Sequence, residues 1–321
     1  MRLCIYVVVA LASSLSARGA SQQAGTPKPT VAFDKLDGRV RVRIGEKLFT
    51  DYVYKKGRFP YMWPIIGAKG RRMTRDFPMR KGVDGETDDH PHHRSMWFTH
   101  GSVNGHEFWS GKGRIVQTTM ALFEKRALLV TRNDWLGSDG KVVCTDERQI
   151  VFGETEVGRF IGFTVTLHAT SGDVVFGDTK EGSMALRLHP RLRLRGKRAA
   201  GEILNSEGVR DKQCWGKRAR WVDYWGPIED QVVGVAIFDH PKNHGYPCRW
   251  HARDYGLAAA NPWGVSQFER KPKGTGDMTL AKGKKLTLRY RFVFHAGGPK
   301  RAGIEAEWQR FARDEPPAKG K

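Results

Sequence analysis

The feature that most constrains the fold is a two-residue alternation of apolar and polar side chains that recurs along the chain. It is clear in residues 40–44, which a Gly45-Glu46 turn joins to the run 48–53. Because side chains of a strand point alternately to opposite faces, the two runs predict a β-hairpin. Further runs predict strands over residues 115–123, 127–135, 141–152, 160–169, 184–189, 219–225, 232–239, 257–261 and 286–295.

Consecutive strands without intervening helices predict an all-β, antiparallel architecture. The exception is residues 302–313, where Ile304, Trp308 and Phe311 recur at helical spacing. No internal repeat and no linker rich in Pro, Gly or Ser interrupts residues 31–297. We therefore expect one large two-sheet (super-)sandwich domain at 31–297, a short C-terminal helix within 298–313 and a disordered tail at 314–321.

The N-terminus has the pattern of a secretory signal peptide. Arg2 precedes an apolar run at 3–12, and small and polar residues follow as far as Gly19. The run is shorter than the roughly 20 apolar residues that a membrane-spanning helix needs. We expect residues 1–19 to be the signal peptide, residues 20–30 a polar leader, and the mature protein to be exported to the periplasm or the cell exterior, with no membrane span.

The charge balance points to an acidic partner. Lysine and arginine number 55 against 34 aspartate and glutamate, a formal net charge of +21. Such a surplus is typical of proteins that meet an acidic polysaccharide, an anionic surface or nucleic acid. The basic residues are dispersed and the chain is predicted to be exported, which argues against nucleic acid. An acidic polysaccharide and an anionic surface remain as partners, and a general solubility role for the charge is the alternative.

The cysteines indicate neither a zinc ribbon nor a disulfide framework. Cys4 lies in the predicted signal peptide, which leaves Cys144, Cys214 and Cys248 without CxxC spacing. A disulfide between Cys214 and Cys248 and three buried free thiols are the two alternatives.

The most informative segment is 88–101, Asp-Asp-His-Pro-His-His-Arg-Ser-Met-Trp-Phe-Thr-His-Gly. Read as a strand, it places His92, Arg94 and His100 on one face, with His93 and Trp97 on the other. Imidazole can be a general acid or base near neutral pH, a metal ligand or a structural hydrogen-bonding group. We interpret the cluster as a functional site. No cofactor is certain, and the alternative is a divalent metal held by His90, His92 and His93.

Further polar clusters lie at the ends of predicted strands and combine histidine, arginine, a carboxylate and an aromatic ring. Aromatic rings pack on the apolar faces of sugars, and charged or amide groups bind sugar hydroxyls. The combination therefore predicts a carbohydrate or glycan ligand. The residues are Glu181, Arg220, Asp223, Tyr224, His240, His251, Arg253, Asp254, Tyr255, Asn261 and Trp263.

Three of these stretches carry a family resemblance: "DDHPHHRSMWFTHGSVNGHEFW", "GKRARWVDYWGP" and "AIFDHPKNHGYPCRWHARDYGLAAANPWG". They resemble a family of exported bacterial proteins labelled PmoA-like, or methane oxygenase PmoA. The resemblance extends over about 31–297 and implies a fold similar to the galactose-mutarotase-like super-sandwich. The family label implies a copper oxygenase with its metal at the histidine cluster.

Our preferred hypothesis is a carbohydrate-active enzyme of the epimerase, lyase or hydrolase type that works by general acid–base chemistry. By similarity to mutarotase-like sites, His93 or His240 would be the acid and Glu181 or Asp223 the base. The residues expected to bind substrate are His90, His92, Arg94, Trp97, His100, Arg220, Tyr224, His251, Arg253, Asp254, Tyr255, Asn261 and Trp263. The rivals are a non-catalytic glycan-binding or polyanion-binding protein and a metal-dependent oxygenase.

Overall fold

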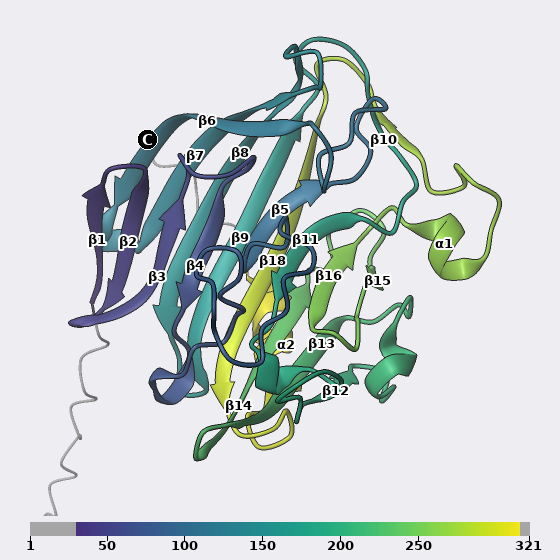
Figure 1. Ribbon diagram of the computed structural model, residues 1–321. Coiled ribbons are helices and arrows are strands. Elements are labelled where there is room, and N and C mark those ends of the chain that lie inside the picture. Colours follow the sequence, from purple (N-terminus) through teal and green to yellow (C-terminus); the bar gives the residue numbers. More distant parts are fainter. Residues whose placement is uncertain (1–29, 315–321) are drawn as a thin grey trace, which may run out of the picture.

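The computed structural model describes residues 30–314, in which two large antiparallel sheets are stacked face to face (Figure 1). The predicted signal peptide lies outside the described residues, as do the leader up to residue 29 and the tail from residue 315. Within residues 30–314 there is no helix with the length and apolar character needed to cross a bilayer.

The first sheet has eight strands in the order β1-β2-β3-β4-β5-β11-β16-β15. The predicted hairpin at 40–53 forms its β2–β3 pair. The bounds are β1 Val31–Leu36, β2 Arg39–Ile44, β3 Lys47–Val53, β4 Tyr61–Ile65, β5 Met96–His100, β11 Gly182–Arg187, β15 Arg249–Trp250 and β16 Leu257–Asn261.

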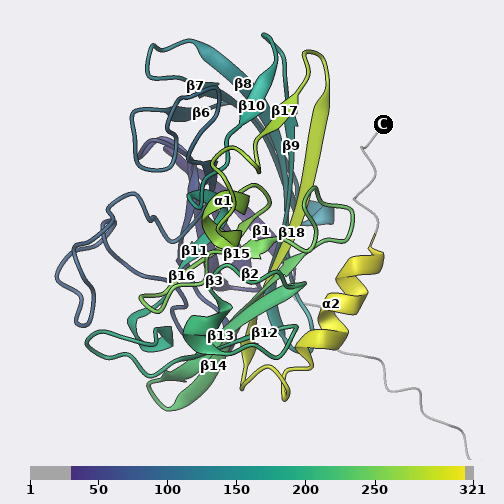
Figure 2. The same ribbon diagram turned by 90° about the vertical axis from the view of Figure 1, so that its right-hand side faces the viewer.

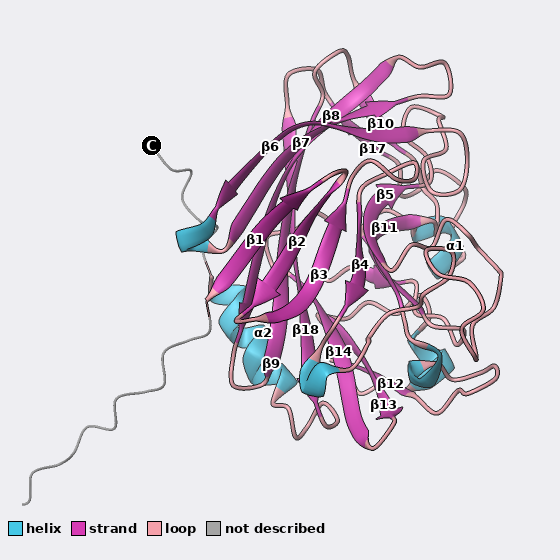
Figure 3. Cartoon of the chain, turned by 60° about the vertical axis from the view of Figure 1, so that its left-hand side comes forward, coloured by secondary structure: helices cyan, strands magenta, loops and turns pink. Residues whose placement is uncertain are grey.

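The second sheet has eight strands in the order β12-β13-β14-β18-β9-β8-β7-β6 (Figure 3). The bounds are β6 Arg114–Phe123, β7 Leu128–Leu136, β8 Val142–Glu154, β9 Gly158–His168, β12 Glu202–Asn205, β13 Trp221–Ile228, β14 Gln231–Asp239 and β18 Lys285–Ala296. A separate two-stranded ribbon pairs β10 Val174–Phe176 with β17 Met278–Leu280.

Aromatic side chains join the two sheets. The Phe49 ring of β3 meets Phe294 of β18 edge-on at 6.0 Å between centroids, and Phe98 of β5 lies 6.1 Å from Phe163 of β9. These contacts place the main core between the sheets, where burial of apolar surface stabilises the fold. The predicted fold class, a large antiparallel two-sheet sandwich with a short C-terminal helix, is confirmed.

Burial patterns show where the sandwich is covered on its outside. Side chains of β9 alternate between buried and half-buried, as in a strand with one open face. Every residue of β5, β11 and β16 is instead buried, so both faces of the first sheet are covered there. The loops before β4 and after β5 provide this cover, since Phe59 stacks on Trp97 and Thr99 donates to the Phe108 carbonyl.

The helix predicted at 302–313 is α2, Ile304–Arg313, and it lies on the outer side of the second sheet (Figure 2). Trp308 Nε1 donates to the Asp239 carbonyl at 3.1 Å, and Phe311 packs on Phe238. The sequence did not predict α1, Val265–Glu269, because one turn of helix is too short to show a periodicity. Short 3-10 turns occur at Ala68–Gly70, Glu124–Arg126, Pro190–Leu192 and Asp211–Cys214.

The three cysteines of the described chain are buried free thiols. Cys214 donates to the Val209 carbonyl, and burial raises the pKa of Cys248 well above its usual value. Of the two alternatives left by the sequence, the structure has the free thiols and not the Cys214–Cys248 disulfide.

Candidate functional site

The histidine-rich segment turns before it enters the sheet. Strand β5 begins only at Met96, and the His93 amide donates to the His90 carbonyl at 2.9 Å. His90 and Ser95 have φ angles of 46° and 58°, the left-handed region that closes tight turns. The prediction of one extended strand with His92, Arg94 and His100 on a shared face is therefore wrong. The turn gathers the three histidines at one place on the outer side of the first sheet.

Five rings form a continuous stack through this place, in the order Tyr255, His90, His93, Trp97 and Phe59. Successive centroids lie 5.5, 4.7, 5.2 and 6.3 Å apart, with interplanar angles of 8°, 6°, 21° and 19°. The His90 side chain is 42% exposed, whereas His93 and Trp97 are each 1% exposed. The stack thus runs from the surface into the covering layer and fixes the orientation of each ring.

Two buried arginines hold the carboxylate next to the stack. Arg187 of β11 donates to Asp89 Oδ1 at 3.1 Å, and Arg75 donates to the same oxygen at 3.1 Å. Burial acts to raise the pKa of Asp89, but Arg187, hydrogen bonds from Thr87 and His90, and Arg75 outweigh it, so this pKa lies well below its usual value. Asp89 is therefore ionised at neutral pH, and Arg187 and Arg75 hold it in place.

Asp89 in turn orients His90. Its Oδ2 lies 2.8 Å from His90 Nδ1, and both side chains are partly exposed. Since an ionised carboxylate only accepts, Nδ1 carries the hydrogen, and in the neutral ring Nε2 has the lone pair. A carboxylate that fixes the tautomer and orientation of an imidazole prepares it to act as a general base.

His93 cannot take the acid role expected from the sequence. Arg187 Nη1 donates to His93 Nδ1 at 3.1 Å, which places the imidazole proton on the buried Nε2. Burial, with the nearby His92 and Arg187, lowers the pKa of His93 well below its usual value. His93 is therefore neutral, inaccessible to a ligand and part of the support of the stack.

His92 lies edge-on to His93 at 4.4 Å and to His90 at 5.7 Å. Burial, followed by the charges of His90 and Arg187, lowers the pKa of His92 to about 4, so it is neutral at pH 7. Within residues 30–314, no three or more His, Cys, Asp or Glu side chains are grouped as a metal site. The rings of the three histidines form a stack and two edge contacts.

Tyr255 lies at the outer end of the stack and is surrounded by arginines. Guanidinium carbons of Arg187 and Arg253 lie 4.6 and 5.3 Å from its ring centroid. Burial raises the pKa of Tyr255, so its hydroxyl stays protonated at neutral pH. Glu181 is half-buried and pairs with Lys180 at 2.8 Å, and its charge acts on Tyr255.

Two further predicted residues lie next to this cluster and are held in contacts with the protein itself. Asp254 pairs with Arg195 at 3.2 Å. His251 is buried, with Nδ1 3.0 Å from the Lys180 carbonyl, and burial, with Arg253 and Lys180, lowers its pKa to about 3. The structure therefore places the segment 251–255 beside the histidine turn.

The structure places three other predicted site residues in the second sheet. Arg289 bonds the buried His240 at 3.0 Å, and the buried Asp223 bonds His295 at 3.0 Å. Arg220 pairs with Glu305 of α2 at 2.7 Å. These side chains are occupied in internal contacts away from the histidine turn. The sequence interpretation that His240 is the acid and Asp223 the base is therefore corrected, because both side chains are held in internal contacts.

The remaining predicted ligand contacts are internal too. Tyr224 OH donates to the Leu257 carbonyl at 3.2 Å, Asn261 Oδ1 accepts from the Trp263 amide at 2.9 Å, and Trp263 stacks on Phe176. His100 Nε2 lies 2.7 Å from the Gly177 carbonyl and is fully buried. These residues, with Trp97 inside the ring stack, support the fold and do not present a surface to a ligand.

His100 makes a testable contribution to acid stability. Burial lowers its pKa to about 4, while the unfolded chain binds a proton near pH 6.5. As pH falls from 6.5 to 4, only the unfolded state takes up this proton, so stability is lost. We expect His100→Gln to reduce the difference in unfolding free energy between pH 7 and pH 4 by on the order of 3 kcal/mol. Urea titrations at the two pH values measure it, and an unchanged difference would contradict it.

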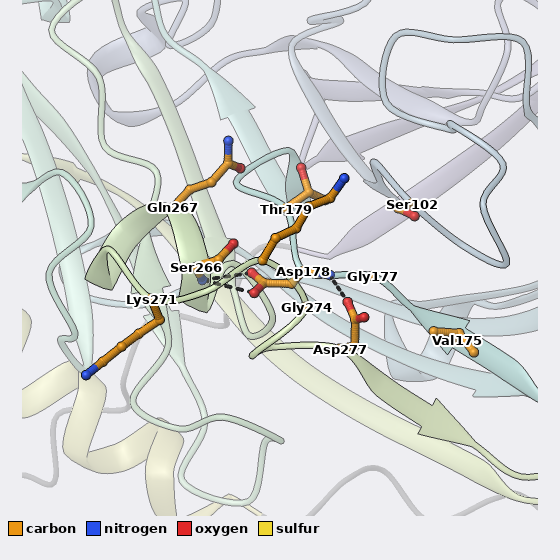
Figure 4. A pocket seen from close by; sticks show the side chains of 11 residues that line it. Ser102, Val175, Gly177, Asp178, Thr179, Ser266, Gln267, Lys271, Gly274 and Asp277 are labelled. Carbon is orange, nitrogen blue, oxygen red and sulfur yellow. Dashed lines mark hydrogen bonds between the residues drawn. The ribbon is translucent and has the colours of Figure 1, made fainter.

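A separate cavity of about 660 Å³ lies between residues 175–179 and the segment that follows β16 (Figure 4). Asp178 accepts from the backbone amides of Ser266 and Gly276, each at 2.9 Å, and Asp277 accepts from the Asp178 amide at 2.6 Å. Its carboxylates therefore hold the loop together, and Lys271 extends away from them in Figure 4. With no histidine or aromatic ring in its wall, it is a weaker candidate than the histidine turn.

Sequence reasoning missed the residues that organise the site: Asp89, Arg75 and Arg187. Arg187 left a usable signal, a single cation within the otherwise apolar run 184–188. A buried charge is costly unless it is paired, so such a residue demands a carboxylate partner. Arg75 lies in a loop, and its sequence neighbours give no comparable indication.

Two stacked antiparallel sheets with a histidine-rich site on the outer side of one of them define a large antiparallel sandwich protein. The chain belongs to the family of unknown function DUF6807, whose model matches residues 39–309. This finding overturns the PmoA-like resemblance. No curated protein matched the sequence.

Solved structures give distant fold similarities. A glycoside hydrolase family 97 enzyme from Pseudoalteromonas sp. strain K8 is 8% identical over 83% of this chain and 34% of its own, with a TM-score of 0.35. The GH36 α-galactosidase AgaA from Geobacillus stearothermophilus is 8% identical over 84% of this chain and 41% of its own, with a TM-score of 0.39. A galactose mutarotase-like protein from Lactobacillus casei ATCC 334 is 10% identical over 83% of this chain and 100% of its own, with a TM-score of 0.35. The chain thus spans about a third of the length of the family 97 enzyme. TM-scores this low carry no argument about function, which has to be argued from the residues of the site.

Proposed function

We propose that the protein is an exported carbohydrate-active enzyme, of the epimerase, lyase or hydrolase type, whose acid–base group is the Asp89–His90 pair. One observation carries the proposal. A half-exposed imidazole has one nitrogen held by a carboxylate, and two buried arginines fix that carboxylate in its ionised form. Such support is what a proton-transfer group needs, because it sets the tautomer and the direction of the free nitrogen.

The proposed chemistry uses the surface end of the stack. His90 Nε2 takes a proton from a sugar hydroxyl or ring carbon, and Asp89 stabilises the imidazolium that forms. The Tyr255 hydroxyl, 5.5 Å away between ring centroids and protonated at neutral pH, supplies a proton to the leaving or neighbouring oxygen. Arg253 and Lys180 bind a carboxylate or a polarised oxygen of the sugar. Glu181 is the second carboxylate within reach of this surface.

The tryptophans favour an enzyme over a binding module. A glycan-binding surface usually exposes flat aromatic rings, but Trp97, Trp109 and Trp263 are at most 2% exposed. Among the described residues, only Trp63 and Trp215 are partly exposed, and they lie in separate pockets beside the histidine turn. Two proton-transfer groups in contact are the feature that a simple binding surface does not need.

The test is a substrate panel for the mature protein, with residues 1–19 removed. Neutral and uronic-acid oligosaccharides are incubated with the enzyme and followed by proton NMR of their anomeric signals. We expect one class to be converted, with a new anomeric signal, an unsaturated sugar or a free reducing end to identify the reaction. Binding without conversion of any member of either class would contradict the proposal and support the non-catalytic alternative.

A further inference from the structure

Two pockets continue from the histidine turn along the first sheet. The smaller, about 190 Å³, has His92, Arg58 and Arg94 in its wall. The larger, about 470 Å³, has Arg94, Lys56 and Trp63 among its lining residues. Because Arg94 forms part of both walls, the two pockets adjoin, and we call them together the Arg94 groove. His92 connects this groove to the proposed acid–base pair, since its ring lies 5.7 Å from that of His90.

The Arg94 groove has more positive charge than its own carboxylates neutralise. Asp37 is the one acidic residue in the walls of the two pockets, and it pairs with Lys55 at 2.6 Å. Arg58 donates to the Ser110 carbonyl at 3.2 Å, and the Arg94 guanidinium lies 5.4 Å from the Tyr61 ring centroid. Across residues 30–314, no carboxylate forms an ion pair with Lys56, Arg58 or Arg94. Cations that share a recess without counter-charges create a positive potential there.

The groove also offers flat apolar surface. Trp63 is half-buried, with its Nε1 donating to Asp76 at 3.0 Å, and the Tyr61 ring lies in the same wall. The indole nitrogen is therefore satisfied internally, and the ring is held in a fixed orientation. A ring of this kind packs against the apolar face of a sugar while nearby cations bind its acidic groups.

The other side of the histidine turn has a carboxylate beside its cations. There Asp254 pairs with Arg195 at 3.2 Å and lies 3.9 Å from Lys212. Two cations share this carboxylate, and Arg253, 5.3 Å from the Tyr255 ring centroid, forms no ion pair within residues 30–314. Three cations of the Arg94 groove have no carboxylate partner, and this larger number favours the groove as the direction in which an extended acidic ligand leaves the site.

We infer that the Arg94 groove binds an anionic glycan chain of the polyuronate class, with the sugar next to His92 entering the Asp89–His90 pair. The inference rests on the proposed function for the reaction, and it adds the substrate class and the direction of the chain. Each carboxylate along the chain meets an unpaired cation of the groove, and the sugar ring over Trp63 contributes apolar contact. Affinity therefore rises as uronate units are added until the groove is filled.

The test is calorimetric titration with a hexamer of galacturonate and with the same hexamer methyl-esterified at its carboxylates. Wild-type protein is compared with Lys56→Ala/Arg58→Ala and with Lys125→Ala/Lys284→Ala, which removes the same charge from exposed positions outside the groove. We expect the groove variant to lose at least roughly tenfold in affinity for the acidic hexamer and the control variant less than about twofold. We also expect the wild type to prefer the acidic over the esterified hexamer by a similar factor.

Equal affinity for the two hexamers, or equal losses in the two variants, would overturn the inference. His90→Ala separates it from the proposed function, because this variant should keep its affinity for the acidic hexamer while losing conversion. Conversion of a neutral oligosaccharide without uronate binding would leave the proposed function and remove the inference. Groove-dependent uronate binding without conversion of any sugar would do the reverse.

Discussion

Replacing His90 by alanine is expected to lower kcat/KM for the converted sugar by about 10²–10⁴-fold. His90 is the one ring of the stack that combines an exposed nitrogen with a carboxylate partner, at 2.8 Å from Asp89. The variant removes the base but leaves Asp89 held by Arg187 and Arg75, so the fold and the positive charge of the groove persist. Steady-state kinetics on the sugar identified by the panel measure the effect.

The control is His106→Ala, which removes another partly exposed histidine in a loop beyond β5. His106 Nδ1 accepts from the Ser138 amide at 3.2 Å and has no part in the ring stack. Its kcat/KM should stay within about twofold of the wild type. A His90→Ala variant that is as active as this control would remove the acid–base assignment.

Replacing Asp146 by alanine is expected to lower the free energy of unfolding by about 3–5 kcal/mol. Asp146 accepts from Asn133 at 2.6 Å, from Trp135 at 2.7 Å and from Arg148 at 2.8 Å, all within the core between the sheets. Asp146 and Arg148 have side chains that are 0% and 1% exposed. Without the carboxylate, the Arg148 guanidinium is left buried among Phe98 and Phe163 without a counter-charge.

Urea unfolding at pH 7 measures this loss, with Asp139→Ala as the control. Asp139 is exposed and accepts from the Lys141 amide in the turn before β8, so its removal should cost less than about 1 kcal/mol. A loss for Asp146→Ala no larger than that for Asp139→Ala would show that the buried pair does not stabilise the sandwich.

The alternation of side chains predicted the strands that have one buried and one open face. Strands β2 and β9 are examples, because their buried side chains alternate with more exposed ones. The same rule missed β4, whose apolar sequence contains Pro64, and β12, which has four residues. A proline inside a strand and a length of only four residues each weaken the period.

The site was predicted only in part, because the sequence indicates which segments carry polar side chains but not which of the two sheets each segment joins. Both segments 90–94 and 251–255 were among the predicted site segments, and the structure brings them together, as the stacking of His90 on Tyr255 shows. Residues at the ends of β13 and β14 carry the same side-chain types, but they belong to the second sheet. Two faces of a sandwich can carry similar polar motifs, so residue type cannot tell which of them share a pocket.

The central claim, that a sugar binds at the outer end of the ring stack, is tested most directly by NMR of histidine side chains. The protein has eleven histidines, which selective ¹⁵N labelling makes individually observable through single substitutions. Titration with the oligosaccharide identified by the panel is expected to shift the ring signals of His90 and His92 and leave those of His240 and His295 unchanged. Shifts at His240 or His295 with none at His90 would contradict the assignment of the site.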